Sequence, residues 1–201
     1  MILVICALLG ELRYVAPRAD IEIVACGVGP VEAAIATANA LSRASYRAVI
    51  NAGIGGAFRG EADIGDARLI TSDVLADLGL EGGAPLTLPD GVSLVERAHS
   101  DPNLLARCAS LGILAATGVT VSSVTTSDAT AARLSSRYGA GVESMEGFSV
   151  LRAAAVGHVP ALQIRGISNY TGDRTRSSWD FDAGARATAL ALGDVLNLLV
   201  P

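Results

Sequence analysis

The segment IEIVACGVGPVEAAIATANALSRA, residues 21–44, joins two kinds of hydrophobic pattern. It begins with a short, mostly apolar and β-branched run, which is typical of a buried strand. Gly27 and Gly29 then mark a turn, and Pro30 lies where the first helical position would be, ahead of an alanine-rich helical pattern. The segment therefore predicts a strand, a tight turn and a helix, which is the repeating unit of an α/β fold.

The same alternation recurs along the chain. Further strands are expected at 1–8, 47–56, 66–75, 118–126, 139–145 and 159–168, and further helices at 128–138, 146–157 and 181–200. Because the strands are continuously apolar, both faces of their sheet are expected to be covered. We expect one domain over 1–201, a three-layer α/β/α sandwich around a mixed, mostly parallel central sheet. The segment 81–91 is expected to be a loop-like insertion.

Composition narrows the classes of function. The chain has 201 residues, 51% of them hydrophobic, and a net charge of −5, which suits one domain with a sizeable core. All fifteen basic residues are Arg and none forms a basic block, so we expect no nucleic-acid partner, no Schiff base and no P-loop. The apolar runs are shorter than the roughly 20 residues that span a bilayer, and the first lacks a signal-peptide pattern. We expect a cytoplasmic protein without membrane contact.

The cysteines and histidines do not form a metal-ligand pattern. Cys6, Cys26 and Cys108 are widely spaced and lie mostly among apolar residues, which favours buried thiols over disulfides. His99 and His158 have no partner at ligand spacing. We therefore expect neither a metal nor a cofactor.

Two glycine-rich loops follow expected strands, where ligands of α/β proteins usually bind. The first, 27–34, could offer free N–H groups to an anion, but it lacks the spacing of a dinucleotide motif and places Glu32 in the first helical turn. A plain tight turn is the alternative for this loop. In the second loop, 51–57, Gly55 is expected to contact a ligand, or simply to allow a tight turn.

Three carboxylates lie beside expected strand ends. Glu143 and Glu146 flank Met145 in VESMEG, residues 142–147, and Glu11 follows the first strand. Acidic residues near a helix start also stabilise the helix dipole, so position alone does not make them functional.

Several motifs together resemble the nucleoside phosphorylase/nucleosidase superfamily. They are ALLGELR (7–13), CGVGPVEAAIAT (26–37), the segments 50–79 and 142–174, and SSWDF (177–181). The combination of SMEG with a later RGISN is specific. Within the superfamily the chain most resembles the futalosine hydrolase family, purine nucleosidases of menaquinone biosynthesis. Its sister family cleaves methylthioadenosine and S-adenosylhomocysteine. The resemblance is weakest over 81–117.

The resemblance implies roles for matching residues. Glu11 would activate the attacking water, while Glu146 would bind the ribose hydroxyls with Met145 beneath the sugar. Such roles suit the chemistry, because cleavage of an N-glycosidic bond passes through an oxocarbenium-like sugar that a carboxylate stabilises. Glu143 receives no role.

Asn169 is a departure from the adenine-cleaving relatives, which have Asp there. An amide both donates and accepts, so it can pair with O6 and a protonated N7 of a 6-oxopurine. Adenine would place its amino group against the amide NH₂, a mismatch of roughly 1–3 kcal/mol. Asn169 thus favours hypoxanthine, as in futalosine, although a turn-stabilising Asn is the alternative.

Other assignments are more open. Asp173 is a candidate proton relay, or a salt-bridge partner of Arg174 or Arg176. The carboxylated tail of futalosine calls for Arg, and Arg174, Arg176 or Arg59 could bind it.

Two interpretations are also open for each of the aromatic residues near these motifs. Trp179 and Phe181 could wall an aromatic pocket or form a helix-start contact. Phe148 could stack near the base or belong to the core.

The glycine loops lack the Arg of the phosphorylase branch, so water is the expected nucleophile. The resemblance implies a purine nucleoside as the ligand, and a homodimer or larger homo-oligomer. A methylthioadenosine/S-adenosylhomocysteine nucleosidase and a non-catalytic nucleoside-binding protein are the alternatives.

Overall fold

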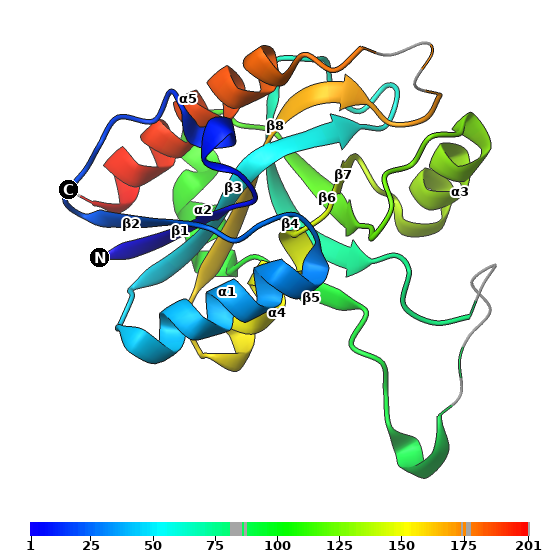
Figure 1. Cartoon of the computed structure of the whole chain (residues 1–201), viewed down its shortest axis with the longest axis horizontal. Helices are drawn as coiled ribbons and strands as arrows, with labels where there is room; N and C mark the ends of the chain where they lie inside the picture. Colours follow the sequence, from blue (N-terminus) through cyan, green and yellow to red (C-terminus); the bar gives the residue numbers. More distant parts are fainter. Residues whose placement is uncertain (81–85, 87, 174, 176–177, 201) are drawn as a thin grey trace.

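The structure is a computed structural model, and it describes residues 1–80, 86, 88–173, 175 and 178–200. A twisted sheet lies at the centre with helices on both sides (Figure 1). The strands of the described part are β1 (Ile2–Cys6), β2 (Ile21–Ala25), β3 (Ala48–Ala57), β4 (Ala67–Leu75), β5 (Arg97–His99), β6 (Ala115–Thr120), β7 (Val142–Ser144) and β8 (Ala161–Tyr170). The helices are α1 (Pro30–Arg43), α2 (Pro102–Cys108), α3 (Asp128–Tyr138), α4 (Gly147–Val156) and α5 (Phe181–Leu199), with short 3₁₀ turns η1 (Leu9–Leu12), η3 (Pro89–Gly91) and η4 (Ala109–Leu111).

The strand order is β2-β1-β3-β7-β6-β4-β5, and β8 pairs with both β3 and β4. Five of the eight pairings are parallel, and the antiparallel ones are β3·β7, β4·β5 and β4·β8. The expectation of a mixed, mostly parallel sheet is therefore confirmed. The pairings also close a ring from β3 through β8, β4, β6 and β7 back to β3.

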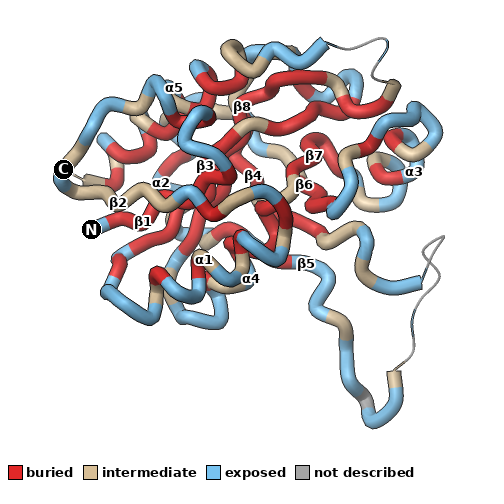
Figure 2. The backbone as a smooth tube through the Cα atoms, in the orientation of Figure 1, coloured by how far each residue is buried: buried red, intermediate tan, exposed pale blue. Residues whose placement is uncertain are grey.

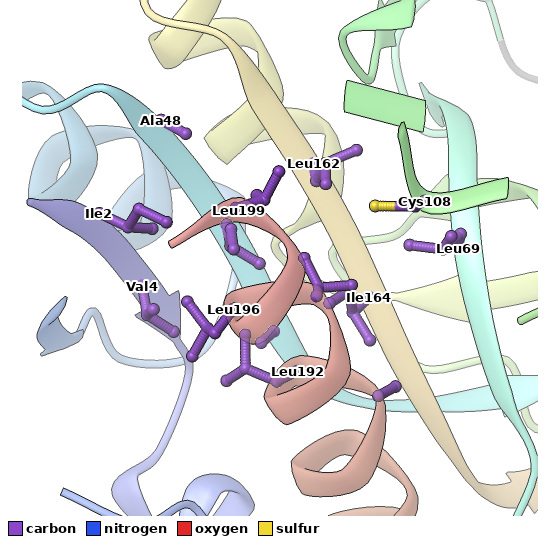
Figure 3. Close-up of a cluster of buried hydrophobic side chains, with 14 of the residues drawn as sticks. Ile2, Val4, Ala48, Leu69, Cys108, Leu162, Ile164, Leu192, Leu196 and Leu199 are labelled. Atoms are coloured by element: carbon purple, nitrogen blue, oxygen red, sulfur yellow. The ribbon is translucent and has the colours of Figure 1, made fainter. Parts of the chain in front are cut away.

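Both faces of the sheet are covered, as the apolar strands predict. On one face, α5 packs against alternate residues of β1, β3 and β8; Figure 3 shows Ile2, Val4, Ala48, Leu162, Ile164, Leu192, Leu196 and Leu199. On the other face, α1 and α4 cover the intervening residues, among them Leu3, Ile5 and Val49. Strands β1, β3, β4, β7 and β8 are buried along most of their length (Figure 2), which confirms the three layers.

Element boundaries differ from the expectations in a few places. β5 and α2 lie in the stretch for which no element was expected, and β7 is shorter than the expected strand at 139–145. Cys6, Cys26 and Cys108 are all free and buried, as expected. In the part of the chain that the structure describes, every helix is too short or too polar to cross a membrane.

The α5 face allows a stability test on one helix. Leu196 is fully buried, whereas Leu190 on the same helix is 72% exposed. We expect Leu196→Ala to lower the free energy of unfolding by about 2–5 kcal/mol, because it leaves a cavity. The matched change Leu190→Ala should stay within about 0.5 kcal/mol. Urea unfolding measures both, and equal effects would contradict the assigned packing of α5.

Candidate active site

The parallel strands β1, β3 and β8 end at one edge of the sheet, and a cleft of about 660 Å³, counting its open mouth, lies there. Its walls come from the residues after β1, the tip of β3, the β7–α4 junction and the end of β8, with Trp179 and Phe181 added from the start of α5. This is the place where loops gather in such sheets and where ligands usually bind.

Glu11 is held rigidly against the cleft. It lies in η1 directly after β1, and only 4% of it is exposed. Its Oε2 accepts a hydrogen bond from the N–H of Leu8 and its Oε1 one from the N–H of Ile54, both at 3.0 Å. Burial raises the pKa of this carboxyl, while the two backbone donors and the charge of Arg165 act the other way. A water held here would meet a stronger base than an ordinary Glu.

Arg165 is a functional residue that the sequence reasoning did not identify. It is fully buried on β8, its Nη2 donates to Asn51, and the same nitrogen lies 3.9 Å from Oε2 of Glu146. Nε and Nη1 find no hydrogen-bond acceptor among the described residues. Because a buried guanidinium needs partners, these free donors indicate acceptors that a ligand or water supplies. A lone Arg within the apolar run of β8 was the signal in the sequence.

Gly53 on β3 makes room for this arrangement. A Cβ at that position would lie 2.7 Å from Nη1 of Arg165 and 2.9 Å from Oε1 of Glu11. The guanidinium and the carboxylate therefore meet over a bare stretch of backbone.

Glu146 is the N-cap of α4 and is also buried. Its Oε1 accepts from the N–H of Gly29 at 3.0 Å, in the turn before α1. The first glycine loop is thus a tight turn, with Gly29 at a φ of 103°. Its N–H group binds the carboxylate of Glu146 and not an external anion. The other oxygen, Oε2, faces Arg165 and has lone pairs left for a ligand.

A buried polar network fixes the start of α4. Oγ1 of Thr120 accepts from the N–H of Phe148 and donates to Oδ1 of Asp73, both at 2.8 Å. Oδ2 of Asp73 accepts from Nε2 of Gln163 at 2.9 Å. Asp73 is fully buried, and this burial raises its pKa to about 6. The network satisfies a free N–H of the helix start and so determines where Glu146 lies.

Asn169 is 6% exposed and lies at a bulge of β8, where the register shifts so that it pairs with Gly56. Its Oδ1 accepts from the hydroxyl of Ser168 at 2.8 Å, and its Nδ2 donates to the carbonyl of Tyr170 at 3.2 Å. One N–H and one lone pair of the amide remain available to a ligand. A Cβ on Gly56 would lie 2.9 Å from Nδ2, so glycine is needed beside this amide.

Glu143, on β7, is buried as well and lines the cleft. Its Oε1 accepts from the N–H of Thr125 at 3.0 Å, and its Oε2 is buried without a hydrogen-bond partner in the described part of the chain. Burial raises the pKa of this carboxyl.

The cleft brings together most of the residues that the sequence singled out. These are Glu11, Gly55, Met145, Glu146, Asn169 and Trp179. Met145 also packs beside Val119 and Phe58, and Trp179 is 43% exposed. Phe181 lines the cleft too.

Phe148 is not part of the cleft lining, so its expected contact with the base is not found. Its ring packs into the core between the sheet and α4, with Leu3 and Ile5, because the first turn of α4 points it inward. The alternative reading, a core residue, fits the structure.

The other exceptions are Asp173 and the three candidate arginines. Asp173 is outside the cleft lining, and its Oδ1 accepts from the N–H and hydroxyl of Thr175 at 2.9 and 2.8 Å. The structure therefore does not bring it to the base. Arg59 lies over the ring of Tyr170, and Arg174 and Arg176 are outside the described residues. No group of three His, Cys, Asp or Glu side chains in the described ranges is placed to hold a metal ion.

Comparison with known proteins identifies relatives. A family model described as the phosphorylase superfamily matches residues 8–200. A futalosine hydrolase of Streptomyces coelicolor is 38% identical over 187 residues, covering 89% of this chain and 79% of the relative. A futalosine hydrolase of Thermus thermophilus is 35% identical over 177 residues, covering 85% and 78%.

Solved structures share the fold at lower identity. The native futalosine hydrolase of Helicobacter pylori has a TM-score of 0.82 at 18% identity, covering 98% of this chain and 97% of that one. A methylthioadenosine/S-adenosylhomocysteine nucleosidase of Colwellia psychrerythraea, in complex with adenine, has a TM-score of 0.81 at 20% identity and covers 98% and 95%.

The network at the start of α4 gives a prediction. Thr120→Val removes the acceptor of the Phe148 N–H and a donor to the buried Asp73. We expect a loss of about 2–4 kcal/mol in the free energy of unfolding, because two buried polar groups lose their partner. Thr120→Ser keeps both bonds and should recover most of the loss. Denaturant unfolding measures the free energy of unfolding of both variants. Similar free energies for the two would show that the network does not stabilise the start of α4.

Proposed function

The chain belongs to the phosphorylase superfamily, and on that premise we propose that it hydrolyses the N-glycosidic bond of futalosine and releases hypoxanthine. The carrying observation is that Asn169, Glu11 and Glu146 line one cleft, with Arg165 buried beside the two carboxylates. Relatives at 35% and 38% identity over most of their length, both named futalosine hydrolases, support this substrate. Enzymatic hydrolysis is therefore favoured over a nucleoside-binding protein without catalysis.

The sugar binds beside the two carboxylates. Oε2 of Glu146 accepts from the ribose hydroxyls, and Met145 packs under the ring. The attacking water lies in the cleft beside Glu11. Its oxygen bonds to C1′ as the C–N bond breaks, its proton passes to Glu11, and the electron pair of the broken bond leaves with the base. The nearby carboxylates stabilise the positive charge that develops on the sugar.

Asn169 binds the leaving base. N7 of the leaving purine takes up a proton from solvent water. The free N–H of the Asn169 amide donates to O6, and its Oδ1 accepts from this N7–H. This pairing stabilises the base as it leaves and disfavours adenine, whose amino group would face the amide NH₂. It separates the proposal from the methylthioadenosine/S-adenosylhomocysteine alternative.

Water is favoured over phosphate as the nucleophile. None of the cleft-lining residues that the structure describes is cationic. The N–H of Gly29, which could bind an anion, already donates to Glu146, and a phosphate beside Glu11 and Glu146 would meet negative charge.

We propose a homodimer or larger homo-oligomer as the working form. The support is an exposed apolar strip beside the cleft, formed by Leu8, Leu9, Val28, Val31 and Ile35, each about half exposed or more. Leu8 and Val28 also line the cleft, so a second copy on this strip would narrow its mouth. The cytoplasmic location, the single domain over 1–201 and the absence of nucleic-acid and membrane partners stay predictions.

The proposal is tested by base release in phosphate-free buffer, with futalosine, inosine and methylthioadenosine offered separately. We expect hypoxanthine from futalosine, and no acceleration by added phosphate. Adenine release from methylthioadenosine at a comparable rate would move the chain to the sister activity. Futalosine that binds without turnover would favour the non-catalytic alternative.

Asn169→Asp tests whether Asn169 selects hypoxanthine over adenine as the leaving base. A carboxyl can protonate adenine and accept from its amino group, so we expect the preference for hypoxanthine over adenine to fall at least tenfold. The measurement is kcat/KM for futalosine and for its counterpart carrying adenine. An unchanged preference would remove Asn169 from base recognition.

Glu11→Gln tests whether Glu11 is the general base that activates the attacking water. Removal of a positioned general base should lower kcat by about 10²–10⁴ while substrate binding persists. Burial raises the pKa of Glu11, so lowering the pH should protonate it earlier than an ordinary Glu. The wild-type rate should therefore begin to fall at a pH above the usual pKa range of Glu. Glu96→Gln, at an exposed position, is the matched control. A near-normal rate in Glu11→Gln would contradict the mechanism.

A further inference from the structure

Glu143 is a buried carboxylate at the cleft that the mechanism above does not use. It is 6% exposed, and its Oε1 is fixed by the N–H of Thr125 at 3.0 Å. Its Oε2 is buried and accepts no hydrogen bond from the residues that the structure describes. An unmatched buried carboxylate oxygen is unfavourable, so it indicates a donor that arrives with the ligand.

The pairing of strands places Glu143 at the base end of the cleft. Gly56, at the tip of β3, pairs with Glu143 of β7 on one side and with Asn169 of β8 on the other. Paired strands are about 4.8 Å apart, so the backbones of Glu143 and Asn169 are separated by roughly 10 Å across a residue without a side chain. A flat ring over Gly56 would have one of these side chains at each edge.

The sugar end lies elsewhere along the same strand. Gly53 faces Glu11 and Arg165 on one side of β3, whereas Gly56, three residues later, faces the other side. At about 3.3 Å per residue, the two ends are roughly 10 Å apart along β3. Glu143 therefore belongs with Asn169 and not with the two carboxylates that serve the sugar.

The chemistry of the base identifies the missing donor. A 6-oxopurine carries O6 between N7 on one side and N1–H on the other. Asn169 pairs with O6 and N7, which leaves N1–H in need of an acceptor at the opposite edge. We propose that Oε2 of Glu143 accepts this N1–H and is a specificity-determining group, an inference that rests on the proposed function.

The same contact rejects adenine. Its N1 has a lone pair and no hydrogen, so it would face Oε2 acceptor to acceptor, with a negative charge on one side. A site built to receive a donor discriminates strongly against a ligand that lacks it. Discrimination between the two purines is thus applied at both edges of the ring, by Asn169 and by Glu143.

Glu143→Gln provides a sharp test because Thr125 sets the orientation of the new amide. The N–H of Thr125 needs an acceptor, so the amide oxygen takes the place of Oε1 and the NH₂ that of Oε2. This NH₂ opposes N1–H of hypoxanthine and donates to N1 of adenine. We expect kcat/KM for futalosine to fall about 10- to 100-fold, and that for aminodeoxyfutalosine, its counterpart carrying adenine, to rise.

The controls separate recognition from folding. Glu96→Gln, on the surface, should match the wild type with both nucleosides, and thermal unfolding should show that Glu143→Gln remains folded. Equal losses with the two nucleosides, or an unchanged preference, would overturn the inference.

Binding of free bases separates this inference from the proposed function. Calorimetry compares hypoxanthine with 1-methylhypoxanthine, which has no N1–H. We expect wild type to prefer hypoxanthine at least tenfold and Glu143→Gln to lose that preference. If wild type shows this preference but does not hydrolyse futalosine, the proposed function fails and the role of Glu143 stands. If wild type binds the two bases equally, the role of Glu143 fails whatever the turnover.

Discussion

The active site depends on one buried cation. Arg165 is fully enclosed, with Asn51 and Glu146 as partners and Glu11 beside it across Gly53. The charge of Glu146 raises the pKa of Glu11 while the charge of Arg165 lowers it, and a guanidinium without partners could not be buried. The arrangement is stable only as a set, because the carboxylate of Glu146 and the amide of Asn51 allow the guanidinium to be buried.

The glycines of β3 make room for this charge cluster and for the other side chains of the site. Glycine weakens a strand, because it is flexible and adds no packing surface. Here Gly53 leaves room for Arg165 and Glu11, Gly55 for the β7 backbone, and Gly56 for Asn169. The loss in strand stability is offset by pairing, since β3 is hydrogen-bonded to β1, β7 and β8. A flat, bare surface results, with polar side chains at its edges.

The rigidity of the site comes from the buried polar network and the backbone donors that hold its carboxylates. Glu146 occupies its position because α4 begins there. The start of α4 is fixed by Thr120, which accepts from the N–H of Phe148 and is itself oriented by the buried Asp73. Gly147 is part of the same constraint, since a Cβ on it would lie 2.3 Å from Oδ2 of Asp73. Glu11 and Glu146 are thus fixed by backbone donors from Leu8, Ile54 and Gly29, which lie far apart in the sequence. Such preorganisation reduces the reorganisation needed during the reaction.

The sequence by itself determined the layers of the fold and the principal polar residues. Apolar runs and helical periodicity are local, so they predicted most strands, the covered sheet and the turn at Gly29. Glu11, Glu146 and Asn169 stood out because they follow strand ends within distinctive motifs. The tertiary structure alone decided the closure of β3, β8, β4, β6 and β7 into a ring, the partners of Arg165, the inward ring of Phe148 and the position of Asp173 outside the cleft. Each of these depends on which strands pair and in what register, and a bulge at Gly55–Gly56 that brings Asn169 opposite Glu143 leaves no local pattern in the chain.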